Sequence, residues 1–284
     1  MHLLAGAVVA DGGIIHAWVV GFGESIGDQS LLELSWPADA GVVATIDEPA
    51  IDTGLDLADP GPIPTSVARM PDGSFAMFGW GTTSAQRSEP VLWRATAATP
   101  AGPWVPGPGT VLEPRDPPAW ESGRLDFPTV LLNASGTQLM VYEGASVADP
   151  DASQIGVAES EDGIAWTRHD TPFIAPGHCG SGDGVSVFMP RAVALERELL
   201  VAYLGTDGST TGGAIYLSSA ETPTSWTCQD PAPVLVGDSF AGSGGIHSFA
   251  AYQVDGVVHL VVEVLGDDFA TSALWLVRLD PPAS

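Results

Sequence analysis

Short runs in which apolar and polar residues alternate fill most of the chain, and glycine-rich turns separate them. Alternation with a period of two predicts strands with one buried face, and no stretch keeps the 3.6-residue period of a helix. Asp72-Gly73 and Asp255-Gly256 stand between successive runs. Such pairs favour tight hairpins because glycine adopts a positive φ without strain. The pattern therefore predicts an all-β chain of antiparallel hairpins.

The hairpins recur at an almost constant interval. Equivalent turn residues lie 59 to 63 positions apart, at Gly13, Gly73, Gly136, Arg197 and Gly256. A third alternating run follows each hairpin in register. Repeats built from several short strands with no helix between them are typical of propeller blades. We therefore predict one domain, a five-bladed β-propeller with blades at 3–54, 63–112, 125–176, 186–236 and 246–280.

The two ends of the predicted ring differ. The first unit begins on its innermost strand at Leu3, and the last unit stops at Asp280-Pro281-Pro282 without a clear fourth strand. Neither end offers an obvious strand to the other's blade. We expect the ring to close by the packing of side chains alone.

Charge narrows the classes of partner. Nine basic residues, all of them arginine, against 35 acidic residues give a formal net charge of −26. Such a charge repels phosphate backbones and anionic membranes, so nucleic acid is not expected as a partner. No run approaches the roughly 18 apolar residues that a membrane span requires. We expect a soluble monomer that takes a small-molecule or oligosaccharide ligand.

Two cysteines leave the redox compartment open. Cys179 and Cys228 flank the fourth unit, and they form either a disulfide that clasps this blade or two unpaired thiols. The opening stretch Leu3–Val9 lacks a basic flank and a cleavage site, so it predicts a strand rather than a signal peptide. A disulfide would fit a secreted or periplasmic protein whose signal has been removed, and a cytoplasmic location stays open.

The third unit carries a resemblance to a known family. Three segments, Arg124–Pro128, Met140–Gly144 and Ile155–Arg168, resemble the five-bladed propeller glycosidases, namely the arabinanase and β-xylosidase group with its invertase-like relatives. The resemblance implies a funnel on the propeller axis where three carboxylates converge from the first, third and fourth blades. Glycoside hydrolysis uses such groups to protonate the glycosidic oxygen and to activate water or attack the sugar. Asp126 falls on the third-blade member.

The other two carboxylates of the family do not appear at their expected positions. Counted back from each turn, the residues equivalent to Asp126 are Leu3, Ile63, Val187 and Ile246, none of them acidic. Asp183, in the glycine-rich segment before the fourth unit, is the nearest substitute. The departure leaves enzymatic activity undecided.

Second strands supply further candidates at the same end of the ring. The residues seven positions after each turn are Val20, Trp80, Glu143, Leu204 and Glu263. A carboxylate in an apolar strand has its pKa raised by burial, as a general acid requires. The candidate catalytic residues are Asp126, Glu143, Glu263 and Asp183. In the candidate mechanism Asp126 orients the sugar or tunes a partner, Glu143 or Glu263 is the proton donor, and Asp183 replaces a missing carboxylate. Each has a structural role as the alternative.

Four more residues are candidates for substrate binding. Arg124 and Arg191 lie near the starts of inner strands, where they either neutralise the acids or hold a substrate carboxylate. Trp80 offers an indole face for stacking a sugar. His247 could bond a sugar hydroxyl, and His2 is a weaker candidate of the same kind. Structural ion pairs and packing are the alternatives.

No cofactor is expected. The sequence has no phosphate-binding loop, no HExxH motif and no Cys or His spacing that suits zinc. Calcium stays open as a second reading, because Asp149-Pro150-Asp151 and Asp267-Asp268 offer oxygen ligands without the spacing of a recognised calcium loop. The leading hypothesis is a glycoside-hydrolase-like protein acting on neutral saccharides. The alternatives are a carbohydrate-binding or scaffold propeller without catalysis, and a funnel turned to another small-molecule reaction.

Overall fold

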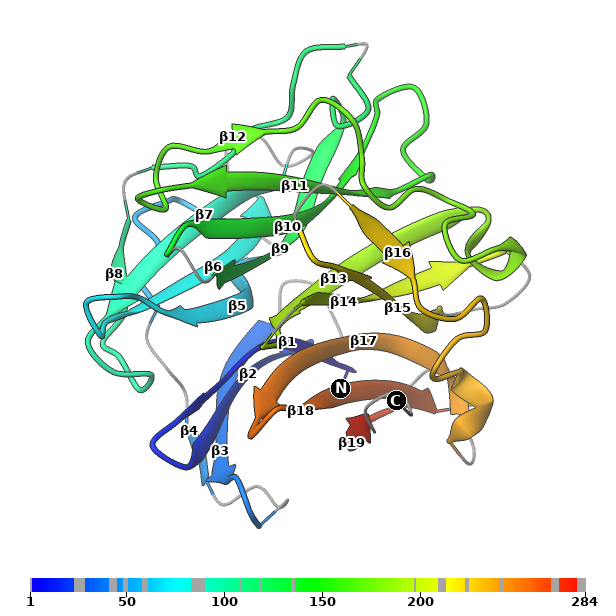
Figure 1. Cartoon of the computed structure of the whole chain (residues 1–284). Helices are drawn as coiled ribbons and strands as arrows, with labels where there is room; N and C mark the ends of the chain where they lie inside the picture. Colours follow the sequence, from blue (N-terminus) through cyan, green and yellow to red (C-terminus); the bar gives the residue numbers. More distant parts are fainter. Residues whose placement is uncertain are drawn as a thin grey trace.

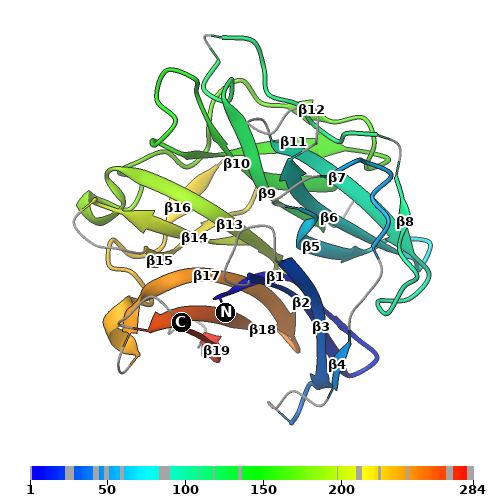
Figure 2. The same cartoon turned by 180° about the vertical axis from the view of Figure 1, so that it is seen from behind.

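The structure is a computed structural model that describes residues 2–22, 29–40, 45–47, 51–57, 61–82, 90–107, 109–117, 119–133, 136–196, 198–208, 213–222, 225–240, 243–266 and 271–279. Its strands form five separate antiparallel sheets arranged in a ring (Figures 1 and 2). The predicted five-bladed β-propeller is confirmed. Each blade is one contiguous piece of chain, because each strand pairs with the strand that follows it in the sequence.

The strands follow one another outward within each sheet. The first sheet holds β1 (His2–Asp11), β2 (Ile14–Phe22), β3 (Gln29–Pro37) and β4 (Thr45–Asp47). The second holds β5 (Ile63–Arg69), β6 (Phe75–Thr82), β7 (Pro90–Ala97) and β8 (Val105–Pro106). The third holds β9 (Arg124–Leu132), β10 (Gln138–Ala145), β11 (Gln154–Ser160) and β12 (Thr167–Arg168). The fourth holds β13 (Ser186–Ala194), β14 (Leu199–Thr206), β15 (Ala214–Ala220) and β16 (Trp226–Cys228). The fifth holds β17 (Ser243–Val254), β18 (Val257–Gly266) and β19 (Ser272–Leu279).

Two 3₁₀ turns, η1 (Ser181–Asp183) and η2 (Gly237–Ser239), are the only helical elements among the residues described. None of these elements is a helix long and apolar enough to cross a membrane. The apolar core is divided among the junctions between sheets. One cluster, for example, joins Val141 and Val157 of the third sheet to Val201 and Tyr203 of the fourth.

The innermost strands β1, β5, β9, β13 and β17 surround the axis, and each carries a bulge partway along its length. A bulge inserts an extra residue and re-aims the side chains beside it. In the third and fourth sheets the bulge holds Phe127 and Met189 at φ values of 48° and 49°. Asp126 immediately precedes the first of these bulges. We call the end of the ring where the innermost strands begin the mouth.

Strand pairing corrects three of the predicted equivalents of Asp126. Leu4, Phe188 and Ser248, not Leu3, Val187 and Ile246, lie opposite Val20, Leu204 and Glu263. The prediction was wrong by one or two residues because the hairpin connections and the bulges differ in length, so counting back from a turn does not reach the same position in every sheet. None of the three corrected residues is acidic.

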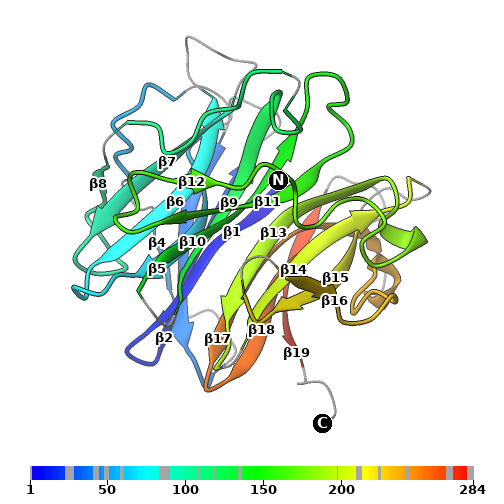
Figure 3. The same ribbon diagram turned by 45° about the horizontal axis from the view of Figure 1, so that its top comes forward.

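The ring closes through hydrogen bonds to β1 as well as through packing. The backbone N–H of Leu3 donates to Glu263 Oε1 and to Ser272 Oγ, each at 3.0 Å, and the N–H of Ala5 donates to Ser248 Oγ at 2.8 Å. β1 thus lies beside β17, and it is seen running through the ring interior in Figure 3. The prediction that the ring closes by packing alone was therefore wrong. Side-chain oxygens on the fifth sheet accept hydrogen bonds from backbone N–H groups of β1.

Other innermost strands are tied to their neighbours in the same way. The hydroxyl of Thr65 donates to Pro128 O at 2.7 Å, and the hydroxyl of Thr129 donates to Pro190 O at 2.8 Å. The inner edge of each sheet lacks a further strand, so its backbone groups need such partners once they are buried. Side chains of one blade therefore satisfy the backbone of the next around the axis.

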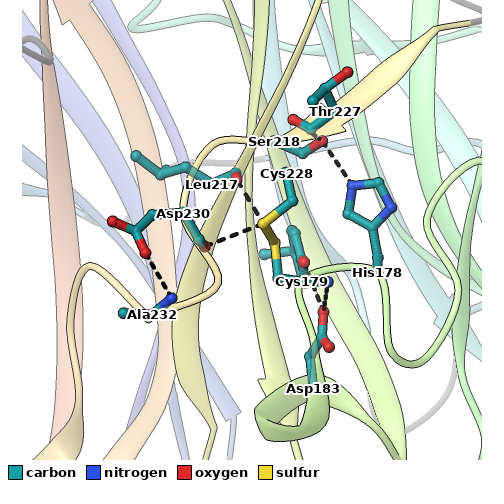
Figure 4. Close-up of a disulfide and its surroundings, with 10 residues drawn as sticks. His178, Cys179, Asp183, Leu217, Ser218, Thr227, Cys228, Asp230 and Ala232 are labelled. Atoms are coloured by element: carbon teal, nitrogen blue, oxygen red, sulfur yellow. Dashed lines mark hydrogen bonds between the residues drawn. A yellow bond between two sulfur atoms is a disulfide. The ribbon is translucent and has the colours of Figure 1, made fainter.

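Cys179 and Cys228 form a disulfide, which settles the alternative that the sequence left open (Figure 4). The bond ties the segment before β13 to β16, the outermost strand of the same sheet. The N–H of Cys179 also donates to Asp183 Oδ2 at 2.9 Å. The fourth blade is consequently clasped at its outer side, and the segment that carries Asp183 is fixed with it.

Candidate active site

Asp126 and Glu143 are direct cross-strand partners on β9 and β10. Opposed residues of an antiparallel pair have Cβ atoms about 4.5 to 5.5 Å apart, so the two carboxyl groups share one small volume. Asp126 is 3% exposed and Glu143 is 2% exposed. The third blade therefore places two buried carboxyl groups side by side at the mouth.

Arg124 links the two acids. Its NH2 atom lies 2.8 Å from Glu143 Oε1, and its Nε atom lies 3.5 Å from Asp126 Oδ2. The same NH2 donates to Ser153 Oγ at 2.5 Å, and the hydroxyl of Ser153 in turn donates to Glu143 Oε1 at 2.7 Å. The guanidinium is about one-third exposed, so one cation at the surface of the mouth contacts both buried acids.

Both oxygens of Glu143 are occupied. Oε1 receives Arg124 and Ser153, and Oε2 receives the backbone N–H of Met189 at 3.1 Å. Met189 lies in the bulge of β13, so the fourth blade helps to hold an acid of the third. Glu143 is thereby fixed in place, with a donor on each of its oxygens.

Asp126 has a different environment. Burial, followed by the adjacent Glu143 carboxylate, raises the pKa of Asp126 to about 8, although Arg124 opposes the shift. Its Oδ1 atom is buried and has no hydrogen-bond partner among the described residues. Asp126 therefore carries its proton at neutral pH, and its buried Oδ1 lacks a hydrogen bond from the residues that the structure describes.

Glu263 and His247 form a second acidic group on the fifth blade. Glu263 is fully buried, and its Oε2 lies 2.9 Å from His247 Nδ1 and accepts the Ser248 hydroxyl at 2.6 Å. The His247 side chain is 43% exposed. β9 and β17 are separated by β13 in the ring, so this pair lies across the axis from Asp126. A buried carboxylate here orients an accessible imidazole.

Asp183 lies away from these groups, at the junction of the third and fourth blades. Its Oδ2 accepts the Tyr203 hydroxyl at 2.8 Å as well as the Cys179 N–H. The third blade has a matching contact, in which the Tyr142 hydroxyl donates to Glu121 Oε2 at 2.5 Å. Glu121 and Asp183 each stand five residues before the residue that precedes the bulge of their inner strand. Asp183 therefore belongs to a contact between a buried acid and a tyrosine that occurs in both blades.

Glu121 was missed by the sequence reasoning. It is fully buried, with Arg115 Nε at 2.8 Å and Arg168 NH1 at 3.4 Å from its Oε1. Burial raises its pKa, while the Tyr142 hydroxyl and the two arginines oppose the shift. The sequence does carry one signal for this contact. Tyr142 and Tyr203 stand at equivalent positions of their blades, one residue before Glu143 and Leu204.

Trp80 and Arg191 take different positions. Trp80 is partly buried near the mouth, and its ring is tilted on that of Phe127 with centroids 5.2 Å apart. Arg191 is 2% exposed and lies inside the ring rather than at its mouth. Leu4, Val20, Ile63 and Phe127 form an apolar cluster beside Trp80. The mouth therefore has apolar residues on the first two blades, and Asp126 and Glu143 on the third.

The structure offers little to a metal ion. Within the described residues no group of three or more His, Cys, Asp or Glu side chains could hold one. Asp149 and Asp151 are both exposed in the connection after β10. Asp267 and Asp268 lie outside the described residues, as does the side chain of His2. Calcium at the first of these connections thus gains no geometric support.

Comparison with solved structures gives the same fold. A crystal structure of a thermostable family-43 glycoside hydrolase superposes with a TM-score of 0.78 at 16% identity, covering 98% of this chain and 90% of that one. An exo-1,5-α-L-arabinanase from a bovine ruminal metagenomic library gives 0.68 at 10% identity, with coverage of 98% and 93%. The sucrose-6-phosphate hydrolase of Lactobacillus gasseri gives 0.71 at 15% identity, with coverage of 99% and 61%. The chain thus has the fold of propeller glycoside hydrolases.

No family model matches the sequence, and no curated protein matches it either. The likeness is therefore one of architecture, and the chemistry of the site has to be argued from the residues themselves.

Proposed function

We propose that this protein is a glycoside hydrolase that acts on neutral saccharides at the mouth of the ring, with Asp126 as the proton donor. The observation that carries the proposal is the contrast between two adjacent carboxyl groups. Glu143 has both oxygens bound by donors, whereas Asp126 is buried with a raised pKa and a free oxygen. Pairs of acids with such unlike surroundings mark acid and base assignments.

His247 is the candidate base in this scheme. With the proton on Nδ1, where Glu263 accepts it, the lone pair of Nε2 is left to take a proton from water. Water would then attack the anomeric carbon while Asp126 protonates the departing glycosidic oxygen. The two groups belong to blades on opposite sides of the axis. A glycosidic bond held between them would thus have the base on one side and the proton donor on the other.

Neutral sugars fit the charges better than acidic glycans do. The net charge of −26 repels polyanions. Arg124 is already shared between two acids, so it offers no free cation for a substrate carboxylate. The partly buried Trp80 could pack on the C–H face of a sugar. The fold likeness to propeller glycoside hydrolases supports a saccharide as the ligand.

Saccharide binding without hydrolysis is the second candidate. Leu4 faces Val20, and Phe188 faces Leu204, so in the first and fourth sheets the positions equivalent to Asp126 and Glu143 are apolar. Glycoside hydrolysis commonly uses two carboxylates, one on each side of the bond that is cleaved. Among the described strands, the only blade with a carboxyl group at both of the equivalent positions is the third, so the two acids lie on the same side. This observation favours a protein that retains the ligand and lacks turnover.

One experiment separates the two candidates. The purified protein is offered a panel of aryl glycosides and neutral oligosaccharides beside Asp126→Asn and His247→Gln, with both product release and ligand-induced thermal shift recorded. Turnover that both substitutions abolish supports hydrolysis. Saturable shifts without turnover support binding alone, and absence of both signals overturns the proposed function.

A further inference from the structure

Arg191 is a buried cation at the centre of the ring. Its Nε donates to Phe249 O at 2.8 Å, its NH1 to Pro190 O at 3.1 Å and its NH2 to Ala5 O at 3.4 Å. These acceptors belong to the fifth, fourth and first blades. A guanidinium has five N–H groups, so two remain beyond these three bonds.

No described carboxylate forms an ion pair with Arg191. The faces of two phenyl rings, Phe127 and Phe249, lie 5.6 and 5.9 Å from its central carbon. The acid whose charge acts on Arg191 is Glu143, and that charge is already shared with Arg124. Burying a charge is costly unless an opposite charge or sufficient hydrogen bonds compensate it. Carbonyl oxygens and ring faces supply only part of that compensation.

A cavity adjoins the guanidinium. It has a volume of about 50 Å³, enough for a halide ion or one or two waters, and all five innermost strands line it. Each strand contributes to the lining, for example through Gly6, Ser66, Thr129, Arg191 and Ala250 in strand order. The hydroxyls of Ser66 and Thr129 donate to backbone carbonyls. Arg191 is therefore the one charged donor among the described side chains around this cavity.

We propose that the axial cavity is a binding site for a single small monovalent anion of halide size, held by the guanidinium of Arg191. The anion supplies the missing opposite charge and joins the five blades through one buried contact. The site lies inside the ring and is separate from the carboxyl groups at the mouth, so it does not depend on the proposed hydrolase activity.

The test uses the whole chain and compares two sodium salts at equal ionic strength. Thermal unfolding is followed in increasing sodium chloride and in sodium gluconate, whose anion is too large for the cavity. An anion that binds only the folded state raises the unfolding temperature with the logarithm of its concentration. We expect this rise in chloride and bromide and not in gluconate. Equal midpoints in chloride and gluconate would overturn the site.

Two variants locate the effect. Arg191→Met removes the cation, and Ala250→Leu fills the cavity while leaving the cation in place. Both should abolish the difference between the salts, whereas Arg69→Met, which removes an exposed arginine, should keep it. A chloride response that survives in either of the first two variants places the anion elsewhere. If neither folds, bromide-soaked wild-type crystals decide the matter, since an anomalous peak in the cavity supports the site and its absence refutes it.

Discussion

Asp126 and Glu143 face each other across β9 and β10, and the guanidinium of Arg124 reaches both. Glu143 takes the shorter contact, at 2.8 Å against 3.5 Å, together with the donors Ser153 and Met189. This unequal sharing leaves Asp126 with little to compensate an ionised carboxylate, so it holds a proton. One cation thus divides two adjacent acids into a fixed group and a protonated one.

The first prediction concerns activity. Asp126→Asn keeps the size and most of the packing of the side chain but cannot release a proton, so turnover of glycosides should fall about 10²- to 10⁴-fold. Far-ultraviolet circular dichroism and the unfolding midpoint should show an intact fold. Turnover that remains at the wild-type level would remove Asp126 from the reaction.

The stability of the protein should depend on pH through the same residue. Asp126 titrates near 3.9 in an unfolded chain and near 8 in the folded protein. Between these values only the folded state holds the proton, so the free energy of unfolding should fall as pH rises, by at most about 1.4 kcal/mol per pH unit, and level off above pH 8. Urea unfolding of wild type and Asp126→Asn at pH 5 to 9 measures the difference. A difference that is independent of pH contradicts the assignment.

Glu143 should tune the proton of Asp126. Its carboxylate is the second cause of the raised pKa of Asp126, after burial. Glu143→Gln removes this charge and keeps the shape, so the pKa of Asp126 should fall. The alkaline limb of the activity profile should then move to lower pH. An unchanged limb, measured as kcat/KM against pH, would show that another group controls it.

The sequence predicted the ring because each blade repeats local signals, an alternating strand and a glycine turn, which need no knowledge of the neighbouring blades. It also predicted that Asp126 and Glu143 would lie at the same mouth, because a hairpin returns its second strand to the end where the first began. Counting residues back from each turn did not locate every equivalent of Asp126, because the turns differ in length. Asp11 pairs with Ile14 across two residues, whereas Arg69 pairs with Phe75 across five.

The remaining features of the site join distant parts of the chain. Leu3 binds Glu263 over a separation of 260 residues, and Met189 binds Glu143 over 46. No local pattern signals such contacts, because they depend on which blades become neighbours when the ring closes. The use of Glu263 to orient His247 and to hold β1 at the same time could therefore be seen only in the folded chain.

The disulfide should stabilise the fold without touching the mouth. Cys179 and Cys228 lie 49 residues apart. A link of this span restricts the unfolded chain, which raises the free energy of unfolding by about 2 to 4 kcal/mol. The double variant Cys179→Ala, Cys228→Ala should lose this amount in denaturant unfolding while its KM for a glycoside stays unchanged. Wild type in reductant should match the variant, and equal stability with and without the bond would contradict the prediction.

Ring closure offers the last prediction. Ser248 is fully buried, donates to Glu263 and accepts the N–H of Ala5. Ser248→Ala removes both bonds and leaves the Ala5 N–H without its acceptor, so the free energy of unfolding should fall by about 1 to 3 kcal/mol. Because the lost bond joins the first and fifth blades, amide exchange should quicken at β1 and β17 more than at β9. Ser35→Ala, which removes an exposed hydroxyl contact with Thr45, is the matched control and should change little. Uniform loss of protection over all five blades would show that Ser248 supports general packing, whereas a loss confined to β1 and β17 would identify the junction where the ring opens first.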